Sequence, residues 1–406
     1  MSRQFGKKLN KEQRKQMMRD LADTFIEKLE SGDFGAWKKS WASVGMDAIP
    51  HNVRGTSYRG INTVILWLSG FDYKSPQWGT YDQWKKLSQK HAISKGEFTL
   101  ESGRKGPWKK TTKWYGVKKG ELGTTVIFWK PQTYKKNEGT DEEEERVSFI
   151  LKTYTVFNRD QTELPPLPQV EGSEFEAKEF NDMERDFNDA LHHYRRTTKG
   201  AEVKLKHGGN RAFYTSSADR IAMPERKQFE SNLHYLSVLG HECIHSTGHA
   251  LRMNRPLGNG FGSKEYAFEE LIAELGSAFL MGAFGLSGDM RHTEYLASWI
   301  RILKDKPEAL MEAASKAQKA TDFIIDPYVE HSRIRGPDED PCACKQCETL
   351  AELRNATAWV LPLATFFESF EPVEVPPRNC PHGSVIQQLD GDLCQWCGAH
   401  SGDEEE

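Results

Sequence analysis

The segment His241-Glu242-Cys243-Ile244-His245 constrains the fold most, because its chemistry requires a helix. Histidines four residues apart lie on one helix face, so both imidazoles can reach the same metal ion. Glu242 then lies about 100° around the helix, where its carboxylate can take a proton from a water on the metal. Apolar residues every three or four positions from 229 to 239 predict this helix, and Gly248 is its expected end. The spacing predicts a zinc site with Glu242 as general base.

A catalytic zinc site needs a third protein ligand. One known pattern would place a histidine at position 251, but this residue is Leu251, so that pattern is excluded. The other common source is a glutamate from a following helix, and the periodic segment 266–280 carries Glu270 and Glu274 one turn apart. We expect Glu270 to bind the metal and Glu274 to orient a histidine or to serve as the alternative ligand. The competing interpretation is that the paired histidines are surface residues or form a structural site.

Three residues near the motif have simpler interpretations than metal binding. We expect His234 and His249 to form local hydrogen bonds or line a substrate pocket, and Cys243 to be a small buried hydrophobic residue.

Charge is divided along the 406-residue chain, whose net charge is only -4. Residues 1–136 hold 27 Lys and Arg against 12 Asp and Glu, whereas the remainder holds 28 against 47. A basic half indicates a polyanionic partner. Eight of the 11 tryptophans lie in this half, interleaved with basic residues as in Trp37-Lys38-Lys39-Ser40-Trp41. Aromatic rings that stack on bases beside lysines that contact phosphates predict binding of single-stranded nucleic acid, although any single tryptophan is more often a core residue.

Six of the seven cysteines lie after residue 340, where their spacing predicts metal sites rather than disulfides. Cys380, His382, Cys394 and Cys397 form a zinc-ribbon-like set, with His400 as the alternative to His382. Cys342, Cys344 and Cys347 form a weaker second candidate that lacks a clear fourth ligand. Thiols of this kind indicate a reducing, cytoplasmic setting. The sequence shows neither a membrane-spanning segment nor a secretory signal.

Four regions follow from these patterns: 1–160, a Pro-rich linker at 161–173, 174–330 and a Cys-rich tail at 331–406 with a disordered acidic end. The predicted fold is α+β, with a mixed α/β first domain, a mainly helical second domain and a small zinc-ribbon-like tail. We expect helices at 9–30, 64–68, 81–87 and 298–323 and strands at 124–129 and 146–157.

Several blocks in order resemble the ArdC-type antirestriction proteins of plasmids and phages. The N-terminal matches are 37–41, Pro50-x-Asn52, Tyr58-Arg59-Gly60-Ile61-Asn62 and the segment from Lys119 to Trp129. The second half matches through 219–224, 241–255, 266–274 and 298–320. The segment 97–113 is additional to the family pattern, and the tail lies outside the resemblance.

The resemblance implies an N-terminal single-stranded DNA-binding domain and a zincin-like metallopeptidase domain that together protect mobile DNA from host restriction. It implies metal ligation by His241, His245 and a glutamate of 270–274, with Glu242 catalytic. The expected partners are single-stranded DNA and a protein substrate in the host. The alternatives are a non-catalytic protein that coats single strands around an inactive or structural metal site, and a metal-dependent nuclease. The expected cofactors are one catalytic zinc and one or more structural zincs in the tail. The expected DNA contacts are Trp37, Lys38, Lys39, Trp41, Asn52, Tyr58, Arg59, Asn62 and Lys119.

Overall fold

The computed structural model divides the chain into two compact units, residues 1–339 and 340–406. It describes residues 7–8, 10–31, 49–70, 73–103, 106–136, 144–167, 173–198, 202–257, 263–286 and 296–334, all of them in the first unit. None of the helices within these ranges is long and apolar enough to cross a membrane. The fold is α+β as predicted, whereas the predicted zinc-ribbon-like tail lies outside the described residues.

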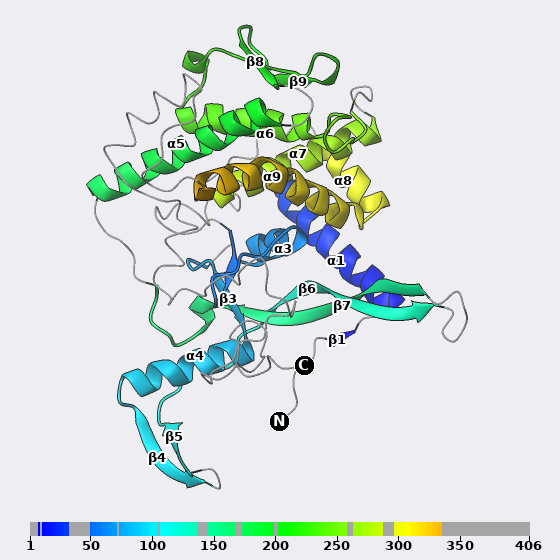
Figure 1. The fold of residues 1–406 in the computed structure, drawn as a ribbon. Helices are drawn as coiled ribbons and strands as arrows, with labels where there is room; N and C mark the ends of the chain where they lie inside the picture. The colour runs from blue at the N-terminus through cyan, green and yellow to red at the C-terminus, as the bar shows by residue number, and fades with distance from the viewer. Residues whose placement is uncertain are drawn as a thin grey trace, which may run out of the picture. The chain divides into compact units, whose positions relative to one another are not determined.

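A five-stranded sheet forms the centre of the N-terminal domain (Figure 1). Its longest strand, β7 (Glu144–Asn158), pairs antiparallel with β6 (Thr124–Lys136), β1 (Lys7–Lys8) and β3 (Gln77–Thr80). The short β2 (His51–Asn52) runs parallel to β3. The two strands expected from β-branched and aromatic runs are therefore confirmed, and both extend further than the sequence predicted.

Two helices lie beside this sheet in the view of Figure 1, and the second of them packs directly on β6. Helix α1 (Lys11–Glu30) starts with a capping box at Asn10, and its buried side carries Ala22, Phe25, Ile26 and Leu29. Helix α3 (Ile61–Ser69) is fixed to the sheet through Asn62. The Asn62 amide donates to the Ile127 carbonyl oxygen at 2.7 Å, and its Oδ1 accepts from the Ile127 N–H at 2.8 Å.

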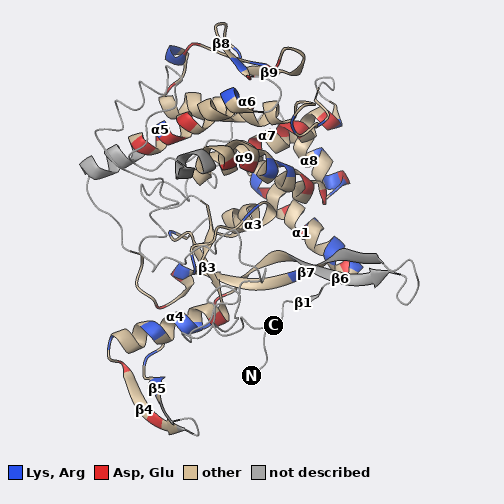
Figure 2. Cartoon of the chain, in the orientation of Figure 1, with Lys and Arg blue, Asp and Glu red and all other residues tan. Residues whose placement is uncertain are grey.

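A helix and a hairpin extend from the N-terminal domain on the side away from α3 (Figure 1). Helix α4 (Tyr81–Ser94) leads into the hairpin of β4 (Phe98–Gly103) and β5 (Gly106–Thr111). The hairpin corresponds to the segment that the sequence marked as additional to the family pattern. The loop 112–119 returns beside α4, where the Tyr115 N–H donates to Ser88 Oγ at 2.7 Å. We call α4, the hairpin and this loop the arm, and Figure 2 shows Lys and Arg on both α4 and β5.

The second domain is mainly helical. Four helices pack together: α5 (Ser173–Thr197), α6 (Asn232–Thr247), α7 (Lys264–Ala283) and α9 (Ala309–Ile334). A three-stranded sheet contacts α6, with β10 (Arg220–Met223) between parallel β8 (Lys204–His207) and antiparallel β9 (Phe213–Thr215). Short 3-10 turns lie at Arg159–Gln161, Ser216–Ala218 and Arg226–Gln228.

The single helix expected at 298–323 is wrong. The structure has α8 (Leu296–Asp305), then Lys306, Pro307 and Glu308, and then α9. Proline lacks the N–H that an uninterrupted helix would need, and its ring disfavours helical geometry at the preceding residue. The last bond before the break runs from the Lys306 N–H to the Ile302 carbonyl at 2.8 Å, and the Ala309 N–H then bonds to the Lys306 carbonyl at 2.9 Å. Alanine and lysine periodicity alone did not outweigh this proline.

The two domains contact each other through helices. The Trp67 ring of α3 packs against Phe279 of α7, with centroids 5.5 Å apart. Arg59, just before α3, pairs with Asp322 of α9, and the Gly60 N–H donates to Gln318 Oε1 at 2.8 Å. Helix α7 therefore contacts the N-terminal domain and, through other residues, contributes to the site described next.

Candidate metal centre

The candidate centre lies where helices α6 and α7 pack closely. Gly276 of α7 permits this approach, because a Cβ there would lie 2.9 Å from the Ile244 side chain of α6. Helix α6 is capped at its N-terminus by Ser231, whose side chain accepts from the His234 N–H, and the helix is followed by Gly248 as predicted. Helix α7 is capped in the same way by Ser263, whose side chain accepts from the Tyr266 N–H. The closely packed helices bring the His-Glu-x-x-His segment against the glutamates of α7.

His241, His245 and Glu270 converge on one point. The two Nε2 atoms are 3.1 Å apart, and Glu270 Oε2 lies 3.4 Å from His241 Nε2 and 3.5 Å from His245 Nε2. All three side chains are largely buried, with exposed fractions of 4%, 12% and 8% respectively. The three donor atoms therefore face a shared position that is shielded from bulk water.

These separations fit a tetrahedral metal ion. Metal–ligand bonds of about 2.0–2.1 Å at tetrahedral angles place ligand atoms about 3.3–3.4 Å apart. The observed separations of 3.1, 3.4 and 3.5 Å bracket that value. Two imidazoles and one carboxylate leave one tetrahedral position open, as in catalytic rather than structural sites. The donor set thus fits a divalent metal.

A further carboxylate lies at the outer nitrogen of each histidine. Glu274 Oε2 is 3.4 Å from His241 Nδ1, and Glu269 Oε1 is 3.3 Å from His245 Nδ1. A carboxylate at Nδ1 favours the tautomer that keeps its proton there and leaves the Nε2 lone pair for a metal. Both imidazoles are thus oriented for metal binding through Nε2.

Glu269 and its partner Arg255 were not among the predicted site residues. Arg255 forms a two-pronged ion pair with Glu269, with Nε–Oε2 and Nη2–Oε1 distances of 2.9 and 2.7 Å. Arg255 also donates to the Ile244 carbonyl and to Thr247 Oγ1, both at 2.7 Å. It therefore fixes Glu269 to the end of α6. Two features of the sequence could have indicated this pair: a second glutamate directly before Glu270, and an arginine shortly after the His-Glu-x-x-His helix.

The charge balance of the centre also favours a cation. Four carboxylates, those of Glu242, Glu269, Glu270 and Glu274, are at most 8% exposed, and buried Arg255 is a permanent positive charge in contact with one of them. Burial lowers the pKa of His241, but hydrogen bonds to Glu270 and Glu274 outweigh it and raise the pKa to about 9. Burial likewise lowers that of His245, yet bonds to Glu269 and Glu270 raise the pKa to about 10. A metal ion would supply the same positive charge as these protons.

Glu242 lies on α6 between the two histidines and is 5% exposed. Its charge contributes to the raised pKa of His245, so the two groups are electrostatically coupled. Its role as general base stays a prediction. Cys243 is fully buried, as expected, and burial raises the pKa of its thiol to about 12. His249 Nδ1 accepts from the Leu251 N–H at 3.2 Å, and His234 packs edge-on against Phe229, so both take part in local contacts.

Most of the expected DNA contacts that the structure describes also make contacts within the protein. Asn52 Oδ1 accepts from the Arg54 and Thr56 N–H groups and stabilises a turn, and Asn62 ties α3 to β6. Tyr58 packs against the sheet core, and burial raises its pKa to about 12. Arg59 pairs across the domain junction, whereas Lys119 is exposed in the arm. Trp37, Lys38, Lys39 and Trp41 lie outside the described residues.

The N-terminal tryptophans divide into core and surface residues. Trp67, Trp78 and Trp84 are buried, and Trp84 Nε1 donates to the Phe157 carbonyl at 2.9 Å. Trp108 and Trp114 are exposed, and both belong to the arm. Among the tryptophans whose side chains are described, only those of the arm combine neighbouring lysines with an exposed ring.

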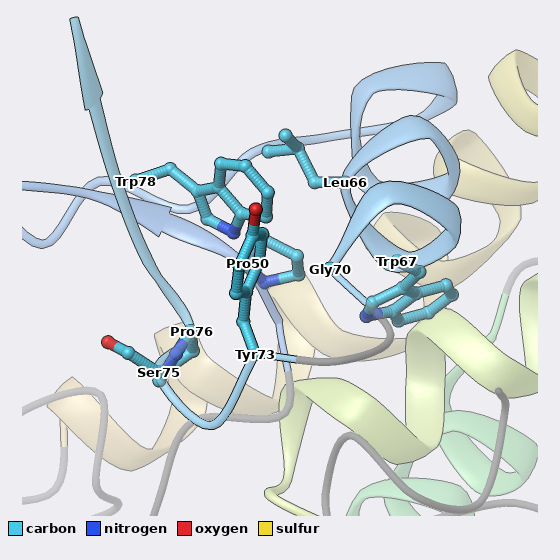
Figure 3. Close-up of a pocket in the computed structure, with 8 residues that line it drawn as sticks. All are labelled: Pro50, Leu66, Trp67, Gly70, Tyr73, Ser75, Pro76 and Trp78. Atoms are coloured by element: carbon cyan, nitrogen blue, oxygen red, sulfur yellow. The ribbon is translucent and has the colours of Figure 1, made fainter. Parts of the chain in front are cut away.

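The N-terminal domain also has a small pocket, which shares no residue with the metal centre (Figure 3). It lies between α3, which contributes Leu66 and Trp67, and the segment that carries Tyr73 and Trp78. Its lining holds no charged side chain, so it offers neither a metal ligand nor a phosphate contact. The predicted structural-zinc ligands Cys342, Cys344, Cys347, Cys380, His382, Cys394 and Cys397 lie outside the described residues.

Two family models match the chain and account for both domains. Residues 15–157 match the N-terminal domain of the anti-restriction factor ArdC, and residues 192–316 match a zincin-like metallopeptidase. The solved structure of the antirestriction protein ArdC from plasmid R388, in its metal-free form, is 30% identical to the chain. It matches with a TM-score of 0.55 over 77% of this chain and 98% of that one. The chain belongs to the ArdC-type antirestriction family.

Further relatives support this assignment. The Mn(II)-bound structure of ArdC from R388 is 31% identical, with a TM-score of 0.52 over 76% of this chain and 97% of that one. An uncharacterised protein, y4eC of Sinorhizobium fredii, is 31% identical over 68% of this chain and 80% of its own length. The DNA primase TraC of Escherichia coli is 33% identical over 79% of this chain, which spans only 20% of that protein.

Proposed function

We propose that this ArdC-type protein binds single-stranded DNA with its N-terminal domain and carries a zinc-dependent peptidase in its zincin-like domain. The main support for a peptidase is the group of His241, His245 and Glu270. Their possible ligand atoms lie 3.1–3.5 Å apart, which fits a tetrahedrally coordinated ion. Two imidazoles, one carboxylate and an open fourth position are typical of catalytic zinc sites. The Mn(II)-bound structure of the R388 relative supports binding of a divalent ion.

Residues of this chain can take the roles that peptide hydrolysis requires beside such an ion. When bound, the metal supplies a Lewis acid that polarises a peptide carbonyl and makes an attacking water more acidic. Glu242 takes a proton from that water on its carboxylate and gives it to the leaving amine. Glu269 and Glu274 keep protons on the Nδ1 atoms of His245 and His241, so that both Nε2 atoms stay available. We propose a host protein as the substrate.

The DNA function rests on the basic N-terminal half, its match to the ArdC N-terminal domain, and the relatedness to a protein named DNA primase. A polyanion partner complements this charge. Zinc binding by the cysteines of residues 340–406 and a cytoplasmic setting belong to the same proposal.

Glu242→Gln tests the catalytic part against the non-catalytic alternative. The variant keeps the shape of the side chain but removes the proton acceptor, so we expect unchanged zinc content and single-strand binding with loss of peptidase activity and of protection. Protection is measured by transfer of unmodified plasmid DNA into a restricting host. Glu265→Gln, exposed at the start of the same helix α7 that carries Glu270, is the matched control. Full protection by Glu242→Gln would instead establish a protein that acts by coating DNA.

A further inference from the structure

The arm carries a large excess of positive charge. Residues 81–119 contain 11 Lys and Arg against three Asp and Glu. Two of the three carboxylates are paired, Glu97 with Lys113 at 3.9 Å and Glu101 with Lys110 at 2.9 Å. Among the described residues no carboxylate pairs with Lys85, Lys86, Lys90, Lys95 or Lys119. The arm therefore presents cations that have no counter-charge within the described part of the chain.

Helix α4 segregates these cations onto one side. Trp84, Ser88 and Ala92 are buried, at the spacing of one helix face. Lys86 and Lys90 are exposed on the opposite face, and Lys85 is exposed at the edge of the buried face. Lys86 and Lys90 lie one turn apart on the same face, and Lys85 adds a third unpaired ammonium group beside them, within about two helical turns. Such a group of cations is of the kind that contacts a phosphate backbone.

An exposed aromatic platform stands beside the start of this helix. The Trp114 ring is 40% exposed and stacks on Tyr81, the first residue of α4, at 6.0 Å and 30°. Its Nε1 donates to the Val117 carbonyl at 3.1 Å, and Gly116 makes room for the ring, since a Cβ there would lie 2.2 Å from it. The ring is therefore held in place although much of it faces solvent. A fixed, exposed indole loses little freedom when a base stacks on it.

The hairpin continues the same combination of groups. Trp108 on β5 is 49% exposed, and the next two residues, Lys109 and Lys110, are exposed as well. The Lys109 ammonium lies over the Phe98 ring, 4.5 Å from its centroid. The hairpin extends away from the rest of the N-terminal domain (Figure 1). On its other strand, Thr99, Leu100 and Ser102 are exposed as well.

We infer that the arm is the surface with which the N-terminal domain binds single-stranded DNA, an inference that rests on the single-strand binding proposed above. Lysines of α4 and the hairpin contact phosphates, while Trp114 and Trp108 stack on unpaired bases. A protein partner fits this surface poorly, because protein interfaces are depleted in lysine. A duplex fits poorly too, because its bases are stacked on one another and offer no free face to an indole.

Two variants of the full chain separate the two kinds of contact. The first is the triple variant Lys85→Gln/Lys86→Gln/Lys90→Gln, which removes phosphate contacts. The slope of its log affinity against log salt concentration should decrease in magnitude by about 2. Its affinity should fall by roughly tenfold to hundredfold near 0.1 M salt. Trp114→Ala removes a stacking platform and should weaken binding by about fivefold to hundredfold without changing that slope. Trp114→Phe keeps an aromatic face and should recover part of the affinity. Binding is followed by fluorescence anisotropy of a labelled oligothymidylate.

Matched controls lie in the zincin-like domain. Lys204→Gln/Lys206→Gln/Lys227→Gln removes three other exposed lysines, and Phe213→Ala removes another exposed aromatic ring, 48% exposed. Both should bind as wild type does. Normal binding by the arm variants, or equal weakening by the controls, would overturn the assignment of the arm while leaving single-strand binding intact. Absence of binding by the wild-type protein would instead refute the proposed DNA function. A change in oligomeric state of Trp114→Ala, with affinity unchanged, would assign the arm to self-association.

Discussion

At the metal centre, the glutamates around His241 and His245 are buried, and three of the four lie within 3.5 Å of a histidine nitrogen. In the arm the lysines are exposed, and most have no partner among the described residues. Buried charges must be compensated within the protein, because water cannot solvate them. Exposed charges carry no such requirement, so their counter-charge can come from a ligand.

This difference separates what a mutation should damage in each region. Removing a partner at the metal centre leaves a buried charge uncompensated, and the cost appears in folding and metal affinity. Removing a lysine from the arm leaves only water, and the cost appears in binding alone. The variants below test whether the two regions divide in this way.

The largest effect is expected from Arg255→Met. The substitution keeps much of the volume but leaves the buried Glu269 carboxylate without the two-pronged partner that it has at 2.7 and 2.9 Å. We expect a loss of about 3–5 kcal/mol in the free energy of unfolding, measured by urea denaturation of the metal-free protein. Lys86→Met in the arm, an exposed residue, should change it by no more than about 0.5 kcal/mol. Similar losses for both variants would remove the distinction between the regions.

The second-largest effect is expected in the dependence of metal affinity on pH. The metal-free protein keeps protons on His241 and His245 up to their pKa values of about 9 and about 10, and a metal must displace them. Affinity should therefore rise by about tenfold to hundredfold per pH unit between pH 7 and 9 and flatten above about pH 10. Calorimetry in buffers of different ionisation enthalpy counts the released protons. Affinity independent of pH would show that the histidines are neutral before binding.

The same raised pKa values set the stability of the metal-free protein. Both lie above the value of about 6.5 expected for an unfolded chain. The stabilising contacts of protonated histidine with carboxylate are therefore fully present below about pH 6.5 and are lost as the pH rises through 9 to 10. The melting temperature of chelator-treated protein should fall over that window.

Glu274→Gln should have a moderate effect on metal affinity. Glu274 lies 3.4 Å from His241 Nδ1 and does not touch the convergence point of the three donors. Loss of such an outer carboxylate typically weakens metal affinity by about 10- to 100-fold. Competition with a fluorescent chelator measures the change, and Glu265→Gln on the same helix is the control. Complete loss of the metal would make Glu274 a direct ligand instead, the alternative that the sequence left open.

The sequence predicted the parts of the molecule that depend on local patterns. Periodic apolar residues placed α6 and α7, and alternating β-branched residues placed β6 and β7, because a helix or strand face repeats at a fixed spacing. The four-residue histidine spacing needed only the helix to bring two imidazoles together. The break at Pro307 is also a local signal, but the alanine and lysine periodicity on both sides of it favours one continuous helix.

Long-range partnerships could not be predicted in the same way. Glu269 looks like its neighbour Glu270 in the sequence, and only the packing of α6 on α7 shows which histidine nitrogen each one faces. The tryptophans pose the same problem, since Trp84 and Trp114 both lie near lysines, yet one is core and the other surface. Burial depends on which distant elements pack against a residue, and no local pattern records that.

The smallest effect is expected from Arg59→Gln, at the junction between the two domains. Its ion pair with Asp322 is largely exposed, 61% on the arginine side, and such pairs contribute at most about 1 kcal/mol. Arg59 was also an expected DNA contact, but binding a phosphate would require it to give up Asp322. We therefore expect a small change in the slope of log affinity for single strands against log salt concentration. The change should be less than the roughly 0.7 that one phosphate contact contributes. Asp322→Asn, which frees Arg59 without removing it, is the control. A full loss of about 0.7 in that slope for Arg59→Gln alone would place the α3–α9 junction on the path of the DNA, beside the helix that carries the predicted metal ligand Glu270.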